Sequence, residues 1–234
     1  LRVRFPNPVG LALEAVTINT AGGIAGGDTL DIALAVGPGA ALTVPSAAAE
    51  KVYRAAGAPA RMSVRLDVAP AGHLVWLPQE TILFDRAEVE RGIAIDLAED
   101  ARLVLGEALV FGRGAMGEVM HEGRVLDRWR VRRAGRLVFA DTLRLDGAIA
   151  ATLGKTAAAN GATAISTLLI APGGEREVQT LRATADSLTG EAGISAWNGV
   201  CLVRLCAADS AVLRGDMAML LSALGTPLPR IWFS

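Results

Sequence analysis

The chain has few of the side chains that build the common metal and redox sites. Its 234 residues include two histidines and two cysteines. Cys201 and Cys206 are five positions apart in a stretch with strand character, so they should point to opposite faces and not share one metal ion. Two cysteines without a C-x-x-C pair are typical of a reducing compartment, and we expect a cytoplasmic protein.

The chain also lacks a surplus of charge of one sign. Lys and Arg number 23 against 24 Asp and Glu, so there is no basic surface for a nucleic acid backbone. Mean hydropathy is high, at +0.39. The two uncharged stretches, residues 32–49 and 156–174, nevertheless contain the turn residues Gly and Pro, which argue against a continuous membrane-spanning helix. We expect neither nucleic acid nor membrane as a partner, and residues 1–10 show no secretory signal pattern.

Motifs of the common enzyme classes are missing as well. The densest glycine cluster, GGIAGGD at residues 22–28, lacks the lysine of a phosphate-binding loop and is interpreted as a turn with positive φ. The chain contains no nucleophile elbow, no H-E-x-x-H and no credible Cys–His pair. The sequence therefore predicts no catalytic residues and a protein that is not an enzyme.

A pattern that recurs four times is present instead. Each copy consists of an apolar strand, a Gly or Ala turn, a second apolar strand and then a carboxylate. The second strands begin at Leu42, Leu74, Leu103 and Leu137, at spacings of 32, 29 and 34 residues. A period of about 30 residues is typical of stacked supersecondary units. We predict a mainly β fold of stacked or helically coiled strands, solenoid-like or sandwich-like.

The pattern changes near residue 161. Residues 163–170 read as a strand and residues 175–188 have helical apolar spacing. Asn198 and Gly199 predict a hairpin between strands at 193–197 and 200–206. Asp209 is placed to cap a second helix that runs to Leu224. We expect this β-α-β-β-α segment, residues 161–234, to pack on a β-strand body, residues 1–160, within a single globular unit.

The four repeats end in carboxylates, namely Glu50, Glu80, Glu107 and Asp141. Stacked repeats would align them in a row. In one interpretation they form salt bridges or are solvated at turns, because a lone buried charge costs several kcal/mol. Arginines are available as partners at positions 54, 86, 91 and 113. In the other interpretation the row attracts cations. Oxygen ligands alone bind transition metals weakly, so such a row suits passage better than storage.

Five segments, in this order, resemble a known family. They are NTAGGIAGGD at residues 19–28, EKVYR at 50–54, WLPQETILFD at 76–85, GRGAMGE at 112–118 and LPRIW at 228–232. Together they resemble the UreD (UreH) family of urease accessory proteins over nearly the whole chain. One departure is VPSAA at residues 44–48, where the family usually has a run containing Thr-Thr-Gln.

This resemblance implies a maturation factor that binds the accessory proteins UreF and UreG and the urease apoenzyme in a hetero-oligomer. It also implies that nickel is delivered through an internal tunnel, without a tightly bound cofactor. Our hypothesis is that carboxylates and one histidine contact transient Ni²⁺ on this route: Asp28, Glu50, Glu80, Asp85, Glu107, Glu118, His121 and Asp141.

Candidate partner-binding residues are Arg113, Met116, Trp232 and Phe233. For the C-terminal pair, a tail packed on its own domain is an equal alternative to an exposed anchor. Two other functions stay open. One is a purely structural adaptor, in which the carboxylates only stabilise strands. The other is a hydrolase that uses paired carboxylates, although such pairs oppose each other across a substrate and do not form a row.

Overall fold

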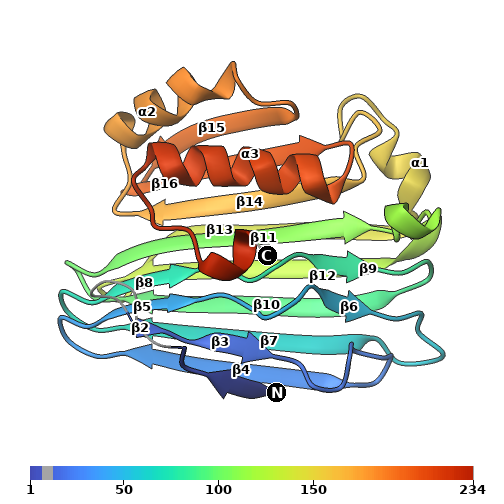
Figure 1. The fold of residues 1–234 in the computed structure, drawn as a ribbon, viewed down its shortest axis with the longest axis horizontal. Coiled ribbons are helices and arrows are strands. Elements are labelled where there is room, and N and C mark those ends of the chain that lie inside the picture. Colours follow the sequence, from blue (N-terminus) through green and yellow to red (C-terminus); the bar gives the residue numbers. More distant parts are fainter. Residues whose placement is uncertain (7–12, 234) are drawn as a thin grey trace.

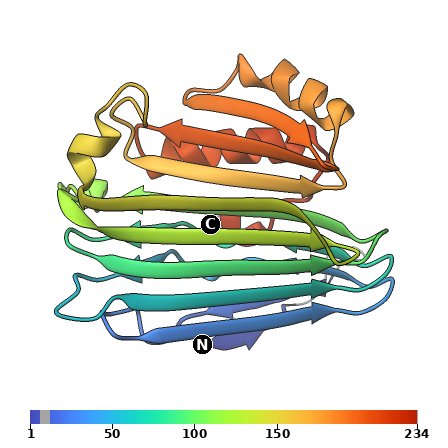
Figure 2. The ribbon, with the colours of Figure 1, turned by 180° about the vertical axis from the view of Figure 1, so that it is seen from behind.

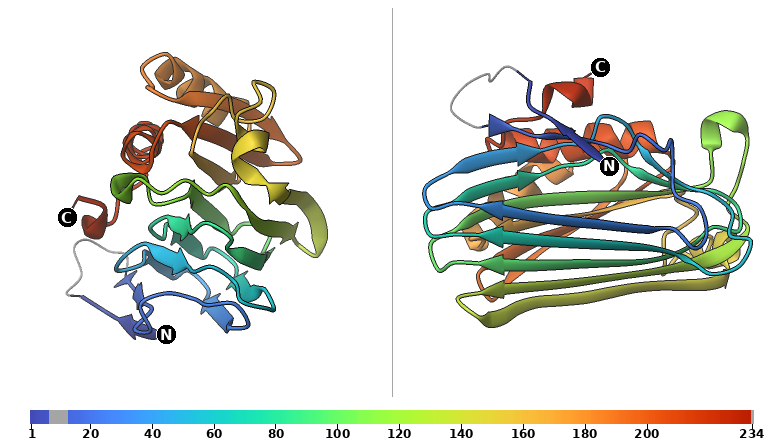
Figure 3. Two further views of the ribbon diagram at one scale, coloured as in Figure 1. Left: turned by 90° about the vertical axis from the view of Figure 1, so that its right-hand side faces the viewer. Right: turned by 90° about the horizontal axis from the view of Figure 1, so that it is seen from below.

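A computed structural model describes residues 1–6 and 13–233 of the chain and consists mainly of strands in two facing sheets. A five-stranded sheet has the spatial order β13 (Arg136–Ala148), β12 (Glu122–Arg133), β10 (Glu88–Leu97), β7 (Ala60–Val68) and β4 (Thr29–Val36) (Figure 2). The end view in Figure 3 shows the two layers of strands, with the helix α3 outside one of them. The predicted mainly β fold with stacked strands is confirmed.

The second sheet has nine strands among the described residues. Its main path is β15 (Glu191–Trp197), β16 (Val200–Ala207), β14 (Ala164–Ala171), β11 (Arg102–Phe111), β8 (His73–Trp76), β5 (Ala41–Val44) and β2 (Leu13–Glu14). Two more strands, β9 (Thr81–Leu83) and β6 (Glu50–Val52), extend it beside β11. A separate pair joins β1 (Arg2–Arg4) to β3 (Val16–Ile18).

The sequence repeat corresponds to a stack of parallel strands. Leu42 lies opposite Leu74, and Leu74 lies opposite Leu103, so the second strands of three repeats align in register in the nine-stranded sheet. The first strands align in the same way in the five-stranded sheet, where β4, β7 and β10 are parallel neighbours. Each of the first three repeats therefore supplies one strand to each sheet and buries its apolar residues between them.

The fourth repeat differs from the expectation. Its first strand, β12, stacks parallel to β10. The chain then reverses at Ala134 and Gly135, both with positive φ, and β13 returns antiparallel to β12 in the same sheet. A two-residue turn of this kind favours a hairpin over a crossover to the other sheet. Leu137 is consequently half exposed instead of joining the aligned leucines.

The C-terminal segment has the expected element order. Helix α2 (Glu175–Ala185) and helix α3 (Ser210–Ala223) contact strands β14 to β16 on one face of the nine-stranded sheet (Figure 1). Asp209 caps α3 through its Oδ1, which accepts a hydrogen bond from the Val212 amide at 2.9 Å. Because β14 pairs with β11, this segment continues the sheet of the strand body, and we propose that the two form a single unit.

Three short elements were not expected from the sequence. They are helix α1 (Ile149–Leu153) and the 3₁₀ turns η1 (Gly114–Met116) and η2 (Arg230–Phe233). Helix α1 has five residues and no side-chain cap, so it offers neither an apolar period nor a start signal. Among the described helices, none is long and apolar enough to cross a membrane.

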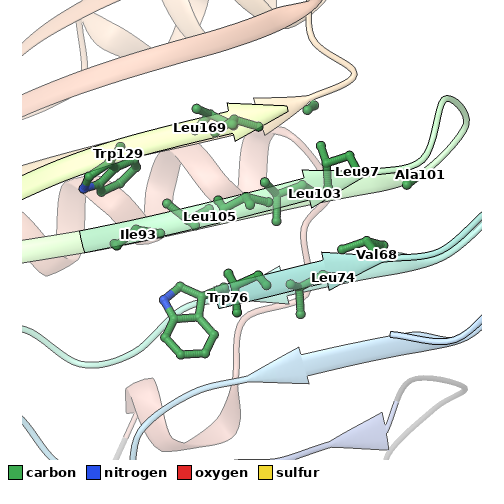
Figure 4. Close-up of a cluster of buried hydrophobic side chains, with 14 of the residues drawn as sticks. Val68, Leu74, Trp76, Ile93, Leu97, Ala101, Leu103, Leu105, Trp129 and Leu169 are labelled. Carbon is green, nitrogen blue, oxygen red and sulfur yellow. The ribbon is translucent and has the colours of Figure 1, made fainter. Parts of the chain in front are cut away.

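The described residues form three buried apolar clusters. One lies between the nine-stranded sheet and helices α2 and α3. The other two lie between the sheets, toward opposite ends of the strands. Figure 4 shows the larger of these, which includes Leu74, Leu103, Trp76 and Trp129. Both indole nitrogens in Figure 4 face the end of this cluster that is remote from Leu97. A layer of charged side chains begins at that end.

The aligned leucines allow a direct test of the stacking. Leu74 is fully buried in the middle of the register, whereas Leu137 is 52% exposed. We predict that Leu74→Ala lowers the free energy of unfolding by about 2–5 kcal/mol, whereas Leu137→Ala changes it by less than about 0.5 kcal/mol. Urea denaturation followed by circular dichroism measures both. Equal losses would mean that the fourth repeat stacks like the other three.

Candidate functional site: a buried charge cluster between two cavities

A charged layer separates the two apolar clusters that lie between the sheets. Three strands that follow one another in the sequence each have one charged residue between two apolar residues at their inward-facing positions. These inward-facing residues are Val89, Arg91 and Ile93 on β10; Leu105, Glu107 and Leu109 on β11; and Val125, Asp127 and Trp129 on β12. Arg91 and Asp127 are register partners within one sheet, and Glu107 faces them from the other.

Arg91 holds the three charges together. Its Nε and Nη2 donate to the two carboxylate oxygens of Asp127 at 3.0 and 2.5 Å, and its Nη1 donates to Glu107 Oε2 at 2.5 Å. All three side chains are about 95% buried. A bidentate pair plus a third charge-assisted bond is the geometry that offsets the desolvation of buried ions.

Two tryptophans complete the cluster. The Trp76 Nε1–H donates to Glu107 Oε1 at 2.7 Å, and the Trp129 Nε1–H donates to Asp127 Oδ2 at 3.0 Å. Each carboxylate therefore keeps one donor that does not depend on Arg91. Burial lowers the pKa of Arg91, but the nearby Asp127 and Glu107 carboxylates outweigh it and raise that pKa above its ordinary value, so the guanidinium is charged at any ordinary pH.

A cavity lies on each side of this cluster. The first, of about 380 Å³, extends between β13 of one sheet and β14 to β16 of the other. The second, of about 280 Å³, extends toward β4, β6 and the turn after β3. Arg91 and Glu107 are the two residues that line both cavities. This ion pair therefore lies between the two cavities.

Further carboxylates line each cavity. In the second cavity Glu50 accepts hydrogen bonds from Asn19 Nδ2 at 2.9 and 3.0 Å. Burial raises the pKa of Glu50, and hydrogen bonds from Asn19 and the Lys51 amide partly offset that rise. In the first cavity Asp141 accepts from Arg204 at 2.8 Å, and Glu191 lies nearby. Within the described part of the chain, no three His, Cys, Asp or Glu side chains form a metal-binding group.

A family model described as "UreD urease accessory protein" matches residues 1–233. The chain belongs to the UreD family. A UreD of Rhodopseudomonas palustris strain BisB18 is 61% identical over 235 residues, which is 100% of this chain and 85% of the relative. A UreD of strain HaA2 is 57% identical (99% and 84% covered), and UreD 1 of Bradyrhizobium sp. strain ORS 278 is 56% identical (100% and 84%).

The family assignment agrees with the resemblance of the five sequence segments. UreD proteins are urease accessory proteins, assembly factors and not enzymes, which confirms the prediction of a non-enzymatic role and removes the hydrolase alternative. The glycine cluster before Asp28 is the predicted turn, with positive φ at Gly22, Gly23 and Gly27. Cys201 and Cys206 belong to clusters on opposite faces of β16, as expected.

Three of the four repeat carboxylates of this UreD chain line the cavities, and they do not form one row. Glu50 and Glu107 belong to the nine-stranded sheet, whereas Asp141 belongs to β13 of the other. Glu80 is one residue out of register, because Glu50 pairs with Thr81. A shift of one residue turns a side chain to the other face of a strand. Glu80 accordingly pairs with Arg214 of α3 at 2.7 Å.

The other proposed nickel contacts are outside the linings of these two cavities. Asp28 is exposed and accepts from the Ala25 amide at 2.8 Å. Asp85 accepts from the His121 and Glu122 amides, and these bonds outweigh its slight desolvation and lower its pKa. His121 is exposed. Glu118 pairs with Arg113 at 2.7 Å.

The proposed partner-binding residues divide into two groups. Met116 is 75% exposed on η1, and Arg113 beside it is stacked 4.3 Å over the ring of Phe84. Trp232 is buried and donates to the Leu77 carbonyl oxygen at 3.1 Å, so the tail packs on its own domain. The side chain of Phe233 lies outside the described residues.

Sequence reasoning missed Asp127 and both indole donors. Arg91 was named only as one of four interchangeable partners for the carboxylates. A signal was available, because Asp127 interrupts the inward apolar positions of β12. The pairing of Arg91 with Glu107 could not be predicted from the sequence, because the two residues are on strands of different sheets.

Removing Asp127 should test the cluster. Asp127→Ala leaves Arg91 with one partner and the Trp129 N–H with none, so we predict a loss of about 3–5 kcal/mol in the free energy of unfolding. The control is Asp146→Ala, which removes the exposed Asp146–Arg144 pair at 3.4 Å. Its effect should stay below about 1 kcal/mol. Urea denaturation at neutral pH measures the free energy of unfolding of both variants. Similar losses of stability in the two variants would contradict a stabilising role of the buried cluster.

Glu50 should make stability depend on pH. A carboxyl whose folded pKa is raised contributes stability that is fully present below its unfolded pKa and is lost as pH rises through the folded pKa. Glu50→Gln removes this dependence. We therefore predict that the stability of the variant relative to the parent increases as the pH rises above about 4, the unfolded pKa of a glutamate. Thermal unfolding at several pH values measures the difference, and a pH-independent difference would refute the assignment.

Proposed function

We propose that this protein is a scaffold in urease maturation that conducts Ni²⁺ along its charged layer. In this proposal it assembles with UreF and UreG, docks on the urease apoenzyme and works in the cytoplasm. The observation that carries the proposal is the pair of cavities that meet at Arg91 and Glu107, with further carboxylates beyond them on both sides.

The donor chemistry supports transient passage. Carboxylates occur along the route, with Glu50 in one cavity, Glu107 between the two cavities and Asp141 in the other cavity. Neither lining includes a histidine. Carboxylate oxygens attract a divalent cation but hold Ni²⁺ less firmly than imidazole does, so an ion can move from one group to the next. The role proposed for nickel is therefore that of cargo and not of a resident cofactor.

The walls of the route strengthen this attraction. Apolar clusters flank the charged layer toward both ends of the strands. Charges in a region of low dielectric act on each other more strongly than they do in water, and apolar walls also focus the field along the route. A cation inside the layer would be guided by the carboxylates and kept from leaving sideways.

A specific observation also supports the second candidate, the purely structural adaptor. Glu107 is bound to Arg91 and Trp76, so it already has the partners of a stabilising residue. In an adaptor the cluster would hold the two sheets together, and nickel would pass elsewhere. The two functions differ in what happens when the outer carboxylates, which are not part of the cluster, lose their charge.

The test is urease activation in cells that express the urease genes with this protein. We predict that Glu50→Gln and Asp141→Asn each lower activation several-fold while the complex with UreF and UreG still co-elutes on a sizing column. Glu80→Gln is the matched control, because Glu80 has the same chemistry but faces α3. Unchanged activation in both route variants would refute conduction and leave the adaptor.

A further inference from the structure

Arg91 lies, with Glu107, where the two cavities meet. Its guanidinium lies between carboxylates that come from opposing sheets, Glu107 on β11 and Asp127 on β12. Both cavities are lined by this group and by Glu107. A cation that moves from one cavity to the other must therefore pass the space that the guanidinium fills.

The seated guanidinium opposes a second cation in two ways. It carries a permanent positive charge in a buried region, where repulsion of an approaching divalent ion at a few ångströms is strong. It also uses the oxygens of Glu107 and Asp127 that face it, so these oxygens are not available as ligands. With Arg91 in this position the route is closed.

We infer that Arg91 is the gate of this route, and that a divalent cation opens it by exchanging places with the guanidinium between Glu107 and Asp127. This inference rests on the proposed conduction of nickel. Three features of the cluster support it: its net charge, the separate anchoring of its carboxylates and the space beside it.

The net charge of the cluster favours the exchange. One guanidinium between two carboxylates leaves one negative charge uncompensated in a buried layer. A divalent cation in the same place balances both carboxylates. The ion that enters therefore removes an electrostatic penalty that Arg91 leaves in place.

The carboxylates stay in position when the guanidinium leaves. Trp76 donates to Glu107 from the side of the second cavity, and Trp129 donates to Asp127 from the side of the first. Both indoles are buried in the apolar cluster of Figure 4. They are neutral donors, so they orient the carboxylates without repelling a cation. The long unbranched arginine side chain is the part of the cluster that can move.

The displaced guanidinium has space and partners on either side. The cavities of about 380 and 280 Å³ adjoin it directly. Glu191 lines the first cavity beside the Asp141–Arg204 pair, and Glu50 lines the second. A carboxylate in each cavity can receive the charge of Arg91, so the exchange does not leave a buried cation unpaired.

The four tryptophans of the chain provide a direct measurement on the unmodified protein. The full chain, labelled with ¹⁵N at tryptophan, gives one indole N–H signal for each of Trp76, Trp129, Trp197 and Trp232. Ni²⁺ is paramagnetic and broadens nearby signals. We expect titration with Ni²⁺ alone to broaden Trp76 and Trp129 first, while Trp232, which is buried against Leu77, is retained.

Removing the gate should make this site easier to fill. In Arg91→Met the side chain keeps its length and loses its charge. We expect half-maximal broadening of Trp76 and Trp129 at a Ni²⁺ concentration about tenfold lower than in the parent. The matched control is Arg214→Met, which frees the carboxylate of Glu80 on the other face and should titrate like the parent. If Arg91→Met does not fold, Arg91→Lys keeps the charge with fewer donors and should shift the titration in the same direction by less.

Two results would overturn the gate. One is broadening of all four signals together, which means diffuse surface binding. The other is an unchanged titration in the Arg91 variants. The proposed conduction fails separately, through unchanged urease activation in Glu50→Gln and Asp141→Asn. Selective broadening of Trp76 and Trp129 together with unchanged urease activation would support the exchange site and contradict nickel conduction. Lost activation without selective broadening would support conduction and contradict the role of Arg91 as a gate.

Discussion

The ion cluster of Arg91, Glu107 and Asp127 is the constraint on which the interior of this protein depends. Three charges are buried between two sheets, where each would be costly alone. They are accommodated because a bidentate arginine and two indole N–H groups satisfy the oxygens that face them. The cluster also prevents the sheets from closing over a continuous apolar core, and the two cavities lie where that core is interrupted.

Strand stacking determines where this interruption can occur. Parallel neighbours in register place equivalent residues side by side, so Arg91 of β10 lies next to Asp127 of β12. Glu107 faces this pair from β11 of the other sheet, and the three charges therefore span the space between the sheets. The same geometry makes small shifts decisive. Glu80 differs from the register of Glu50 by one residue, and it lies on the helix side of the sheet instead of in the layer.

The UreD family assignment identifies this protein as a urease accessory protein, but it does not assign functions to the residues of the interior. An accessory protein of urease has to present surfaces to other proteins, and the exposed Met116 turn is one candidate for such a surface. The buried layer is of a different kind, because partners cannot reach it except through the cavities. The proposed passage of a small cation would use this buried layer, and the proposed scaffold role would use the surface.

The amino-acid sequence by itself determined the strand-rich class, the repeat and most of the C-terminal elements, because apolar periodicity and turn residues are local signals. The aligned leucines at 42, 74 and 103 and the cap at Asp209 are examples. Only the tertiary structure decided that Leu137 leaves the stack, that Trp232 packs on its own domain and that Arg91 joins Glu107 to Asp127. These outcomes depend on which strands share a sheet and which face each side chain takes. The decisive contacts join residues from 16 to 155 positions apart, beyond the range of any local pattern.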